Sequence, residues 1–161
     1  MDENEKAFQD YYDDVAAVCY GCGRLNEHGL QIKSYWDGEE AVCQFKPKPF
    51  HTALPGYVYG GLIASLIDCH STGMAAAAAY RAAGRPMDSK PNLRFVTASL
   101  HVDYLKPTPK DAILTVRATV TSMKQRVITI SSSVYAAETM TARGEVVCVR
   151  APEHWSNAGA G

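Results

Sequence analysis

Hydrophobic and polar positions in the first third of the chain predict a short covering element and a β-hairpin. In residues 3–18 the apolar side chains have the spacing of one helical stripe: Phe8, Tyr11, Tyr12 and Val15. Residues 30–35 and 41–45 alternate between apolar and polar on either side of Asp37-Gly38, a favoured hairpin turn. We therefore expect a short helix followed by two antiparallel strands.

The next segment predicts one long helix that is buried on most sides. From residue 61 to residue 83 the chain is apolar nearly all round, and Gly84 and Pro86 follow as residues that commonly end a helix. A helix of this kind left half exposed would form a large apolar patch in water. We therefore expect a β-sheet to wrap around it.

Four long candidate strands supply that sheet: residues 94–105, 112–123, 126–137 and 140–150. Prolines end the first of them, and Lys124-Gln125 and Glu138-Thr139 form compact turns between the others. The simplest arrangement of these four strands is an antiparallel meander.

Strict alternation along the first of these strands predicts which side chains face the helix. One face is apolar and consists of Val96, Ala98, Leu100, Val102 and Tyr104. The other face is largely polar and includes Thr97. The alternation therefore places Thr97 away from the helix unless the strand bends or a second subunit meets it.

Length and composition indicate one globular α+β domain. The chain has 161 residues, of which 47% are hydrophobic and 20% charged, so it can bury a core but has no room for a second catalytic domain. We expect an N-terminal covering helix or arm over residues 1–18, the main domain over residues 19–152 and a flexible tail over residues 153–161. The net charge of −1 and the lack of a dense basic stretch argue against nucleic acid as a partner.

The N-terminus and the cysteines indicate a cellular compartment. Residues 1–5 are acidic, unlike a secretory signal, and apolar runs long enough to span a membrane are interrupted. Five scattered cysteines argue against a disulfide framework. We expect a soluble cytoplasmic protein with reduced thiols and no membrane association.

Gly60, Gly61 and Asp68 form the stretch most suited to acyl chemistry. The free amides at a helix N-terminus can hold a carbonyl oxygen as it becomes negative, and glycine lets a ligand approach them closely. A carboxylate on an otherwise apolar helix must be paired, exposed in a cavity or protonated. Seven residues along a helix separate Gly61 from Asp68 by about 10 Å, so two chains are needed to bring these groups to one carbonyl.

This stretch, in this order of elements, resembles the hotdog-fold acyl-CoA thioesterases of the phenylacetate-pathway and mammalian acyl-CoA thioesterase type. Tyr59-Gly60-Gly61 with Asp68 is similar to the His-Gly-Gly and downstream Asp of that family, and residues 71–74 and 102–107 continue the likeness. Cys19-Tyr20-Gly21-Cys22-Gly23 is similar to a segment in one branch. The resemblance implies a hotdog fold, in which an antiparallel sheet of five to six strands wraps a long central helix.

The resemblance also implies the roles of particular residues. Asp68 corresponds to the general base or nucleophile, the Gly61 backbone N–H to the group that binds the thioester carbonyl, and Thr97 to a residue that orients the attacking water. The sequence departs from the family where Tyr59 replaces a histidine and Ala53 replaces an Asn or Gln. We expect these changes to alter the activity or the range of substrates.

Further residues are candidates for substrate binding. Tyr59 and Gly60 adjoin the helix start, Thr72 shares a helix face with Asp68, and His51 lies in the preceding loop. His70 is displaced by about 160–200° from Asp68 around the helix, which favours a structural role. Near the mouth of the site, four basic side chains are candidates to meet the phosphates of coenzyme A: Lys90, Lys106, Lys124 and Arg126.

Cys19 and Cys22 have the spacing of half a zinc site. Neither a second Cys-x-x-Cys nor a close histidine pair follows, whereas a structural zinc site usually has four such ligands. The sequence therefore favours a tight turn with buried thiols and no metal.

The predicted activity is hydrolysis of acyl-CoA thioesters by an obligate homodimer, with a dimer of dimers as a further assembly. The resemblance implies that the reaction needs no cofactor. Two alternatives stay open: a non-catalytic module that binds or senses acyl-CoA, and a hotdog-fold hydratase or dehydratase of acyl thioesters, which would require a histidine such as His51.

Overall fold

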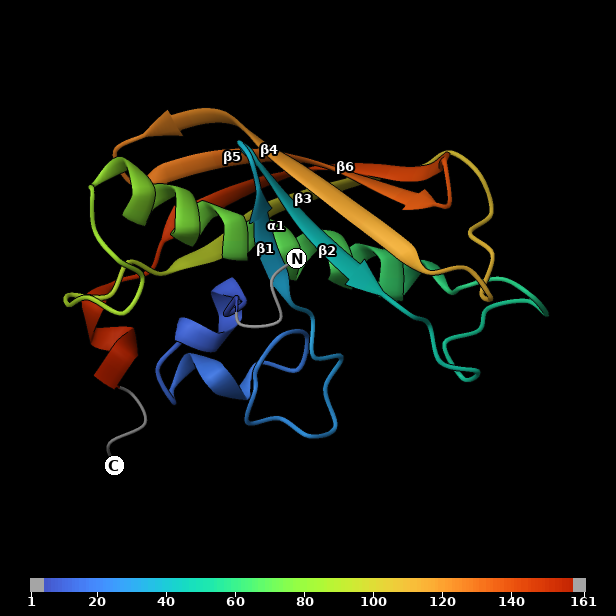
Figure 1. The fold of residues 1–161 in the computed structure, drawn as a ribbon, viewed down its shortest axis with the longest axis horizontal. Helices are drawn as coiled ribbons and strands as arrows, with labels where there is room; N and C mark the ends of the chain where they lie inside the picture. The colour runs from blue at the N-terminus through green and yellow to red at the C-terminus, as the bar shows by residue number, and fades with distance from the viewer. Residues whose placement is uncertain (1–4, 158–161) are drawn as a thin grey trace.

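A long helix lies along one face of a six-stranded antiparallel sheet in the computed structural model, which describes residues 5–157 (Figure 1). The helix, α1, spans Gly60–Ala82, close to the predicted range. The strands are β1 (Ser34–Asp37), β2 (Glu40–Phe45), β3 (Phe95–Tyr104), β4 (Leu114–Lys124), β5 (Val127–Ala136) and β6 (Thr139–Arg150). This arrangement confirms the predicted hotdog fold.

The order of strands in the sheet corrects the predicted four-strand meander. Strands β4, β5 and β6 do form a meander, but β3 pairs with β6, and β4 pairs with β2, so the order is β1-β2-β4-β5-β6-β3. Two-residue turns oblige β4, β5 and β6 to pair with their neighbours in sequence. The connection over residues 105–113 imposes no such pairing, and it carries the chain from one part of the sheet to the other.

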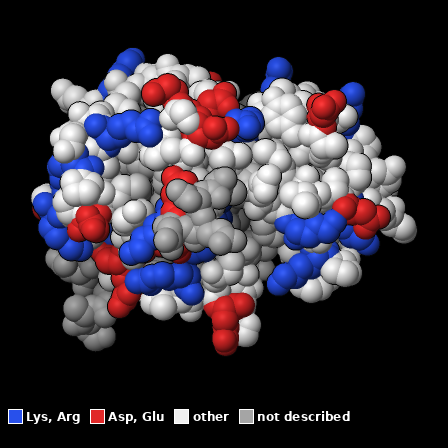
Figure 2. Space-filling model, in the orientation of Figure 1, with Lys and Arg blue, Asp and Glu red and all other residues white. Residues whose placement is uncertain are grey.

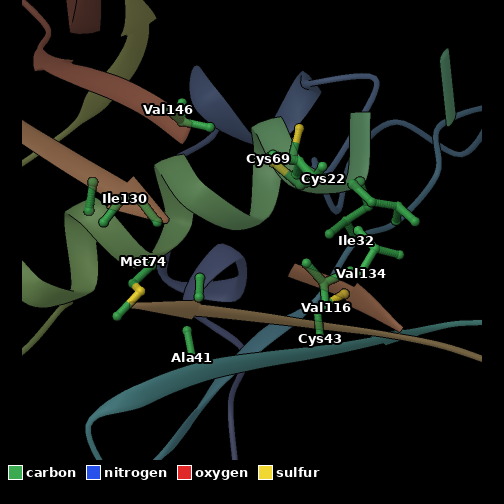
Figure 3. Packing of buried hydrophobic residues seen from close by; sticks show 14 of the residues in the cluster. Cys22, Ile32, Ala41, Cys43, Cys69, Met74, Val116, Ile130, Val134 and Val146 are labelled. Atoms are coloured by element: carbon green, nitrogen blue, oxygen red, sulfur yellow. The ribbon is translucent and has the colours of Figure 1, made fainter. Parts of the chain in front are cut away.

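The core forms between α1 and the sheet, as the all-round apolar pattern predicts. Figure 3 shows buried side chains of this core from α1 and from several strands, including Met74, Val116, Ile130 and Val146. By length and composition α1 could cross a membrane, contrary to the expectation that apolar runs of that length are interrupted in this chain. However, 67% of its most apolar 18-residue window is buried inside the domain, as in the core helix of a globular protein.

The hairpin of β1 and β2 turns at Asp37-Gly38, as predicted, and Gly38 has the positive φ of 64° that favours glycine. Strand β1 begins at Ser34 rather than at residue 30. Gln31 has a φ of 56°, which is incompatible with an extended strand and delays its start.

The N-terminal segment is not the single covering helix that its apolar stripe predicts. It forms two short 3-10 turns, η1 (Phe8–Tyr11) and η2 (Ala16–Val18). Between them the Asp13 carboxylate accepts hydrogen bonds from the amides of Val15 and Ala16, which starts a new turn and prevents continuation of the first. In Figure 1 this segment, in blue, lies below α1, whereas β5 and β6 run above it.

The range assigned to a flexible C-terminal tail contains a third 3-10 helix, η3 (Glu153–Asn157). Residues 1–4 and 158–161 of the predicted N-terminal arm and C-terminal tail lie outside the described residues.

Charged side chains of both signs are interspersed on the face of the molecule shown in Figure 2. Opposite charges also pair directly at the first hairpin: Arg117 donates from Nη1 to Asp37 Oδ2 and to Glu40 Oε2, each at 2.9 Å. Among the residues that the structure describes, this face therefore carries a mixture of both charges rather than one extended region of a single sign.

Candidate active site

Asp68 and Thr97 are brought together from α1 and β3. The Thr97 hydroxyl donates a hydrogen bond to Asp68 Oδ1. The prediction that Thr97 faces away from the helix is therefore wrong. The pairing of β3 with β6 skips Ala98 between Thr97 and Ser99, and this β-bulge reverses the alternation along the strand. Phe95 and Thr97 face the helix before the bulge, and Val102 and Tyr104 face it afterwards.

Asp68 and Thr97 border a cavity of about 460 Å³ with mostly apolar walls. Four segments line it: the N-terminal segment, α1, the start of β3 and the C-terminal end of the described chain. Thr72 and Ala76 continue the helix wall, and the aromatic rings come from Tyr12, Phe95 and Trp155. This volume is within the range of about 300–1,000 Å³ typical of small-molecule sites.

The cavity also contains polar side chains that the sequence did not indicate as site residues, Tyr12 and Arg94. Burial raises the pKa of Tyr12 well above its usual value, so its hydroxyl keeps its proton. Arg94 forms an ion pair with Asp13, and burial lowers the Arg94 pKa. No sequence motif marks either residue, because Tyr12 and Arg94 are distant in sequence. They line the same cavity only after the N-terminal segment folds against the chain just before β3.

The N-terminus of α1 forms a second feature with exposed backbone. Tyr59 is its N-cap residue, and its side chain makes no capping hydrogen bond within the described part of the chain. The first amides of an α-helix have no acceptor in the helix, so they can bind a carbonyl oxygen. A Cβ on Gly61 would lie 2.4 Å from the Tyr59 ring, which shows that this ring packs directly over Gly61.

Tyr104 stabilises the same turn by donating from its hydroxyl to the Gly60 carbonyl at 2.7 Å. Beside it lies a cavity of about 260 Å³ whose lining includes Gly60, Ile63, Tyr104 and Lys106. Lys106 is thus the one predicted phosphate-binding cation among the residues that line these two cavities. Gly60 and Asp68 border different cavities, and about 10 Å of helix separates Gly61 from Asp68 within one chain.

Of the other predicted substrate-binding residues, Thr72 lines a cavity and Arg126 does not. Thr72 lines the Asp68 cavity, but its hydroxyl donates to the carbonyls of Asp68 and Cys69 at 3.2 Å, so it also has a local structural role. Arg126 lies in the turn between β4 and β5, outside both cavity linings, and donates to the Arg150 carbonyl at 3.5 Å.

His51 and His70 both make hydrogen bonds within the fold. His51 is buried and accepts a hydrogen bond at Nδ1 from the Lys48 amide at 3.1 Å; its pKa is lowered by burial and by the Lys48 charge. His70 is fully buried, with Nδ1 2.8 Å from the Ser34 hydroxyl and Nε2 3.2 Å from the Ala41 carbonyl. Neither imidazole lines the Asp68 cavity.

Three cysteines meet in the wall of the Asp68 cavity. The sulfurs of Cys19, Cys22 and Cys69 all lie within 4.8 Å of one another, and those of Cys19 and Cys69 are 4.0 Å apart. The neighbouring thiols of Cys22 and Cys69 lower the Cys19 pKa, and the contacts within the cluster raise the pKa values of Cys22 and Cys69. The Cys-x-x-Cys spacing marks only the first two, because Cys69 comes from α1.

Comparison with known proteins places this arrangement in a family. Residues 55–143 match the model of the thioesterase superfamily, a match that includes all of α1 and β3. The chain therefore belongs to the thioesterase superfamily.

Individual relatives agree with this assignment. The chain is 32% identical over 93 residues to acyl-coenzyme A thioesterase THEM4 from Xenopus laevis, which covers 58% of this chain and 36% of that protein. The chain thus spans about a third of the length of this curated relative. A solved thioesterase superfamily protein from Shewanella loihica PV-4 is 43% identical, with a TM-score of 0.65 over 89% of this chain and 99% of that one.

More distant structures share the fold alone. The PaaI protein of the E. coli phenylacetic acid degradation operon is 17% identical, with a TM-score of 0.62 over 76% of this chain and 81% of that one.

Proposed function

We propose that this protein hydrolyses acyl-CoA thioesters at a site formed by Asp68 of one chain and the Gly61 amide of another. The observation that carries the proposal is the position of Asp68. Its carboxylate accepts a hydrogen bond from Thr97 and borders an apolar cavity large enough for an acyl group. Membership of the thioesterase superfamily and the acyl-coenzyme A thioesterase among its relatives support the same reaction.

In this mechanism the thioester carbonyl oxygen accepts a hydrogen bond from the Gly61 N–H at the positive end of α1. Asp68 then removes a proton from the attacking water, or attacks the carbonyl carbon directly and forms an acyl intermediate that water hydrolyses. The C–S bond breaks, and the coenzyme A sulfur leaves and is protonated. Thr97 is a positioning residue, because its hydrogen bond limits the orientations of the carboxylate.

The two cavities suggest which part of the substrate binds where. The cavity beside Asp68 has mostly apolar walls with aromatic rings from three segments, which suits the acyl group. Lys106 lines the cavity at the start of α1, which makes it the first candidate to bind a phosphate of coenzyme A. Arg126 is exposed in a turn at the end of the sheet and is a second candidate for that role.

A homodimer would bring the two groups together. One chain holds Gly61 and Asp68 about 10 Å apart along α1, too far for one carbonyl to contact both. Strand β3 carries Thr97 and forms one edge of the sheet, and its residues 97–101 are exposed. A ten-residue edge strand presents a row of backbone groups that a second copy can pair with. Two such dimers would form the larger assembly, and we expect the protein in the cytoplasm.

The direct test is thiol release from a panel of acyl-CoAs with short, long and aromatic acyl groups. Turnover by the wild type, with its loss in the Asp68→Asn variant, is the expected result. Tight binding of acyl-CoA without turnover of any member would contradict hydrolysis and indicate a binding module. Addition of water to an unsaturated acyl-CoA without thiol release would instead indicate a hydratase.

Subunit mixing tests the shared site. Asp68→Asn and Gly61→Ala homodimers should each be weakly active, but exchange of their subunits would create mixed dimers with one unaltered Asp68 and Gly61 facing each other. We expect activity to recover on mixing. A mixture no more active than the two separate variants, under conditions where subunits exchange, would contradict a site formed by two chains.

A further inference from the structure

Cys19, Cys22 and Cys69 form a cluster that the proposed hydrolysis does not use. Cys19 and Cys22 belong to the loop after η2, whereas Cys69 lies on α1, 47 residues beyond Cys22. Figure 3 shows Cys22 and Cys69 near each other where the N-terminal segment meets the helix. All three residues line the cavity that contains Asp68.

The spacing of the three sulfurs suits a tetrahedral metal ion. Zinc–thiolate bonds of about 2.3 Å at tetrahedral angles place neighbouring sulfurs about 3.8 Å apart. The sulfurs here lie within 4.8 Å of one another, and the Cys19–Cys69 pair is 4.0 Å apart, so small rotations of the side chains would complete the geometry. A disulfide would need a much shorter separation of about 2.05 Å.

The backbone around the cluster also holds the sulfurs close. A Cβ on Gly21 would lie 2.2 Å from the Cys69 sulfur, so only glycine allows the loop to approach α1 this closely. The Gly23 amide donates to the Cys19 carbonyl at 2.8 Å, which closes the Cys19–Cys22 turn. A Cβ on Gly23 would lie 2.2 Å from the Ala17 carbonyl oxygen, which restricts that position in the same way.

We propose that Cys19, Cys22 and Cys69 bind one divalent zinc ion per chain, with the fourth coordination position directed to the cavity. Three protein ligands with an open position differ from a closed structural zinc site, which has four. Thiolate ligands prefer borderline and soft cations, so we expect this site to bind magnesium and calcium poorly. Binding releases protons from the thiols and joins the N-terminal segment to α1, so it also stabilises the fold.

The test uses the full chain, reduced and stripped of metal with a chelator, and cobalt(II) as a spectroscopic probe. We expect one equivalent of cobalt per chain, a thiolate-to-cobalt charge-transfer absorption and complete displacement by zinc. Cys19→Ala should weaken metal binding by more than about 100-fold. Loss of a group that hydrogen-bonds to a ligand already lowers metal affinity by about 10- to 100-fold, and loss of the ligand itself should lower it further. Cys43→Ala is the matched control, since Cys43 is a buried cysteine outside the cluster.

A second readout covers variants that fold poorly. Zinc should raise the melting temperature of the wild type and of Cys43→Ala, but not that of Cys19→Ala, whose side chain is partly exposed and tolerates truncation best. The absence of a charge-transfer band in the fully reduced wild type would overturn the proposal. Equal cobalt binding by Cys19→Ala and Cys43→Ala would also overturn it.

Discussion

Asp68 and His70 are polar residues two positions apart on α1, yet they lie in opposite environments. Asp68 borders an open cavity and accepts a hydrogen bond from Thr97. His70 is fully buried, and both of its ring nitrogens have partners in the first hairpin, Ser34 and Ala41. Two residues rotate a side chain by about 200° around a helix, so one faces the cavity and the other the protein interior.

The difference shows how one apolar helix serves both stability and chemistry. On the His70 face, Gln9 donates to the Ser34 hydroxyl at 2.9 Å and accepts from the Ser34 amide at 2.8 Å, so η1, β1 and α1 are joined by one buried network. On the Asp68 face, the carboxylate borders space that a substrate can fill. We therefore expect substitutions on the two faces to change different measured quantities.

The largest effect is expected for Asp68→Asn. It keeps the shape of the side chain and an oxygen that accepts from Thr97, but it removes the basic and nucleophilic carboxylate. We expect kcat for acyl-CoA hydrolysis to fall about 10³-fold, or about 4 kcal/mol, with the urea midpoint of unfolding unchanged. A variant that retained full activity would contradict the assigned role of Asp68.

The next effect concerns stability on the opposite face. Burial lowers the pKa of His70 from 6.5 to about 4. Between these values the unfolded chain binds more protons than the folded chain, so the free energy of unfolding falls as pH falls from about 6.5 to 4, by up to about 3 kcal/mol. Urea unfolding at several pH values, in metal-free reducing buffer, measures this loss.

The control for this pH dependence is His70→Gln, which retains a donor and an acceptor but does not titrate. We expect it to remove most of the dependence, while His51→Gln removes less, because in the described structure one His51 ring nitrogen is hydrogen-bonded and both His70 ring nitrogens are. An unchanged pH dependence in His70→Gln would show that another group is responsible.

Gly61→Ala extends the comparison from side chains to backbone. The added Cβ would lie 2.4 Å from the Tyr59 ring, so the ring or the first turn of the helix beside the Gly61 amide must shift. We expect kcat to fall about 10²-fold, or about 2.7 kcal/mol, as for loss of one oxyanion donor. Gly60→Ala places a Cβ 3.2 Å from Tyr104 and should have a smaller effect; the reverse order would argue against a role for the Gly61 amide.

Thr97→Val should have the smallest effect. It preserves the shape of the side chain but removes the hydroxyl that orients Asp68, so we expect kcat to fall about tenfold, or about 1.4 kcal/mol. Thr97→Ser keeps the hydroxyl and should remain close to wild type in steady-state thiol release. Equal losses in the two variants would indicate packing rather than the hydrogen bond.

Local pattern predicted the elements well, because each one has a strong periodic signal. The range 61–83 differs by one residue at each end from α1, and the two-residue turns of β4, β5 and β6 were visible in the sequence. The N-terminal stripe misled, because the Asp13 side chain competes for backbone amides and divides the segment. The spacing of apolar residues carries no information about such hydrogen bonds between side chain and backbone.

The sequence by itself determined the long buried helix, the hotdog order of elements and the Gly61-to-Asp68 spacing, because these depend on residues near one another in the chain. Only the tertiary structure decided that β3 pairs with β6, that the bulge at Ala98 turns Thr97 toward Asp68, and that Cys69 joins Cys19 and Cys22. These contacts join residues distant in sequence, and the geometry of the packed sheet and helix selects them.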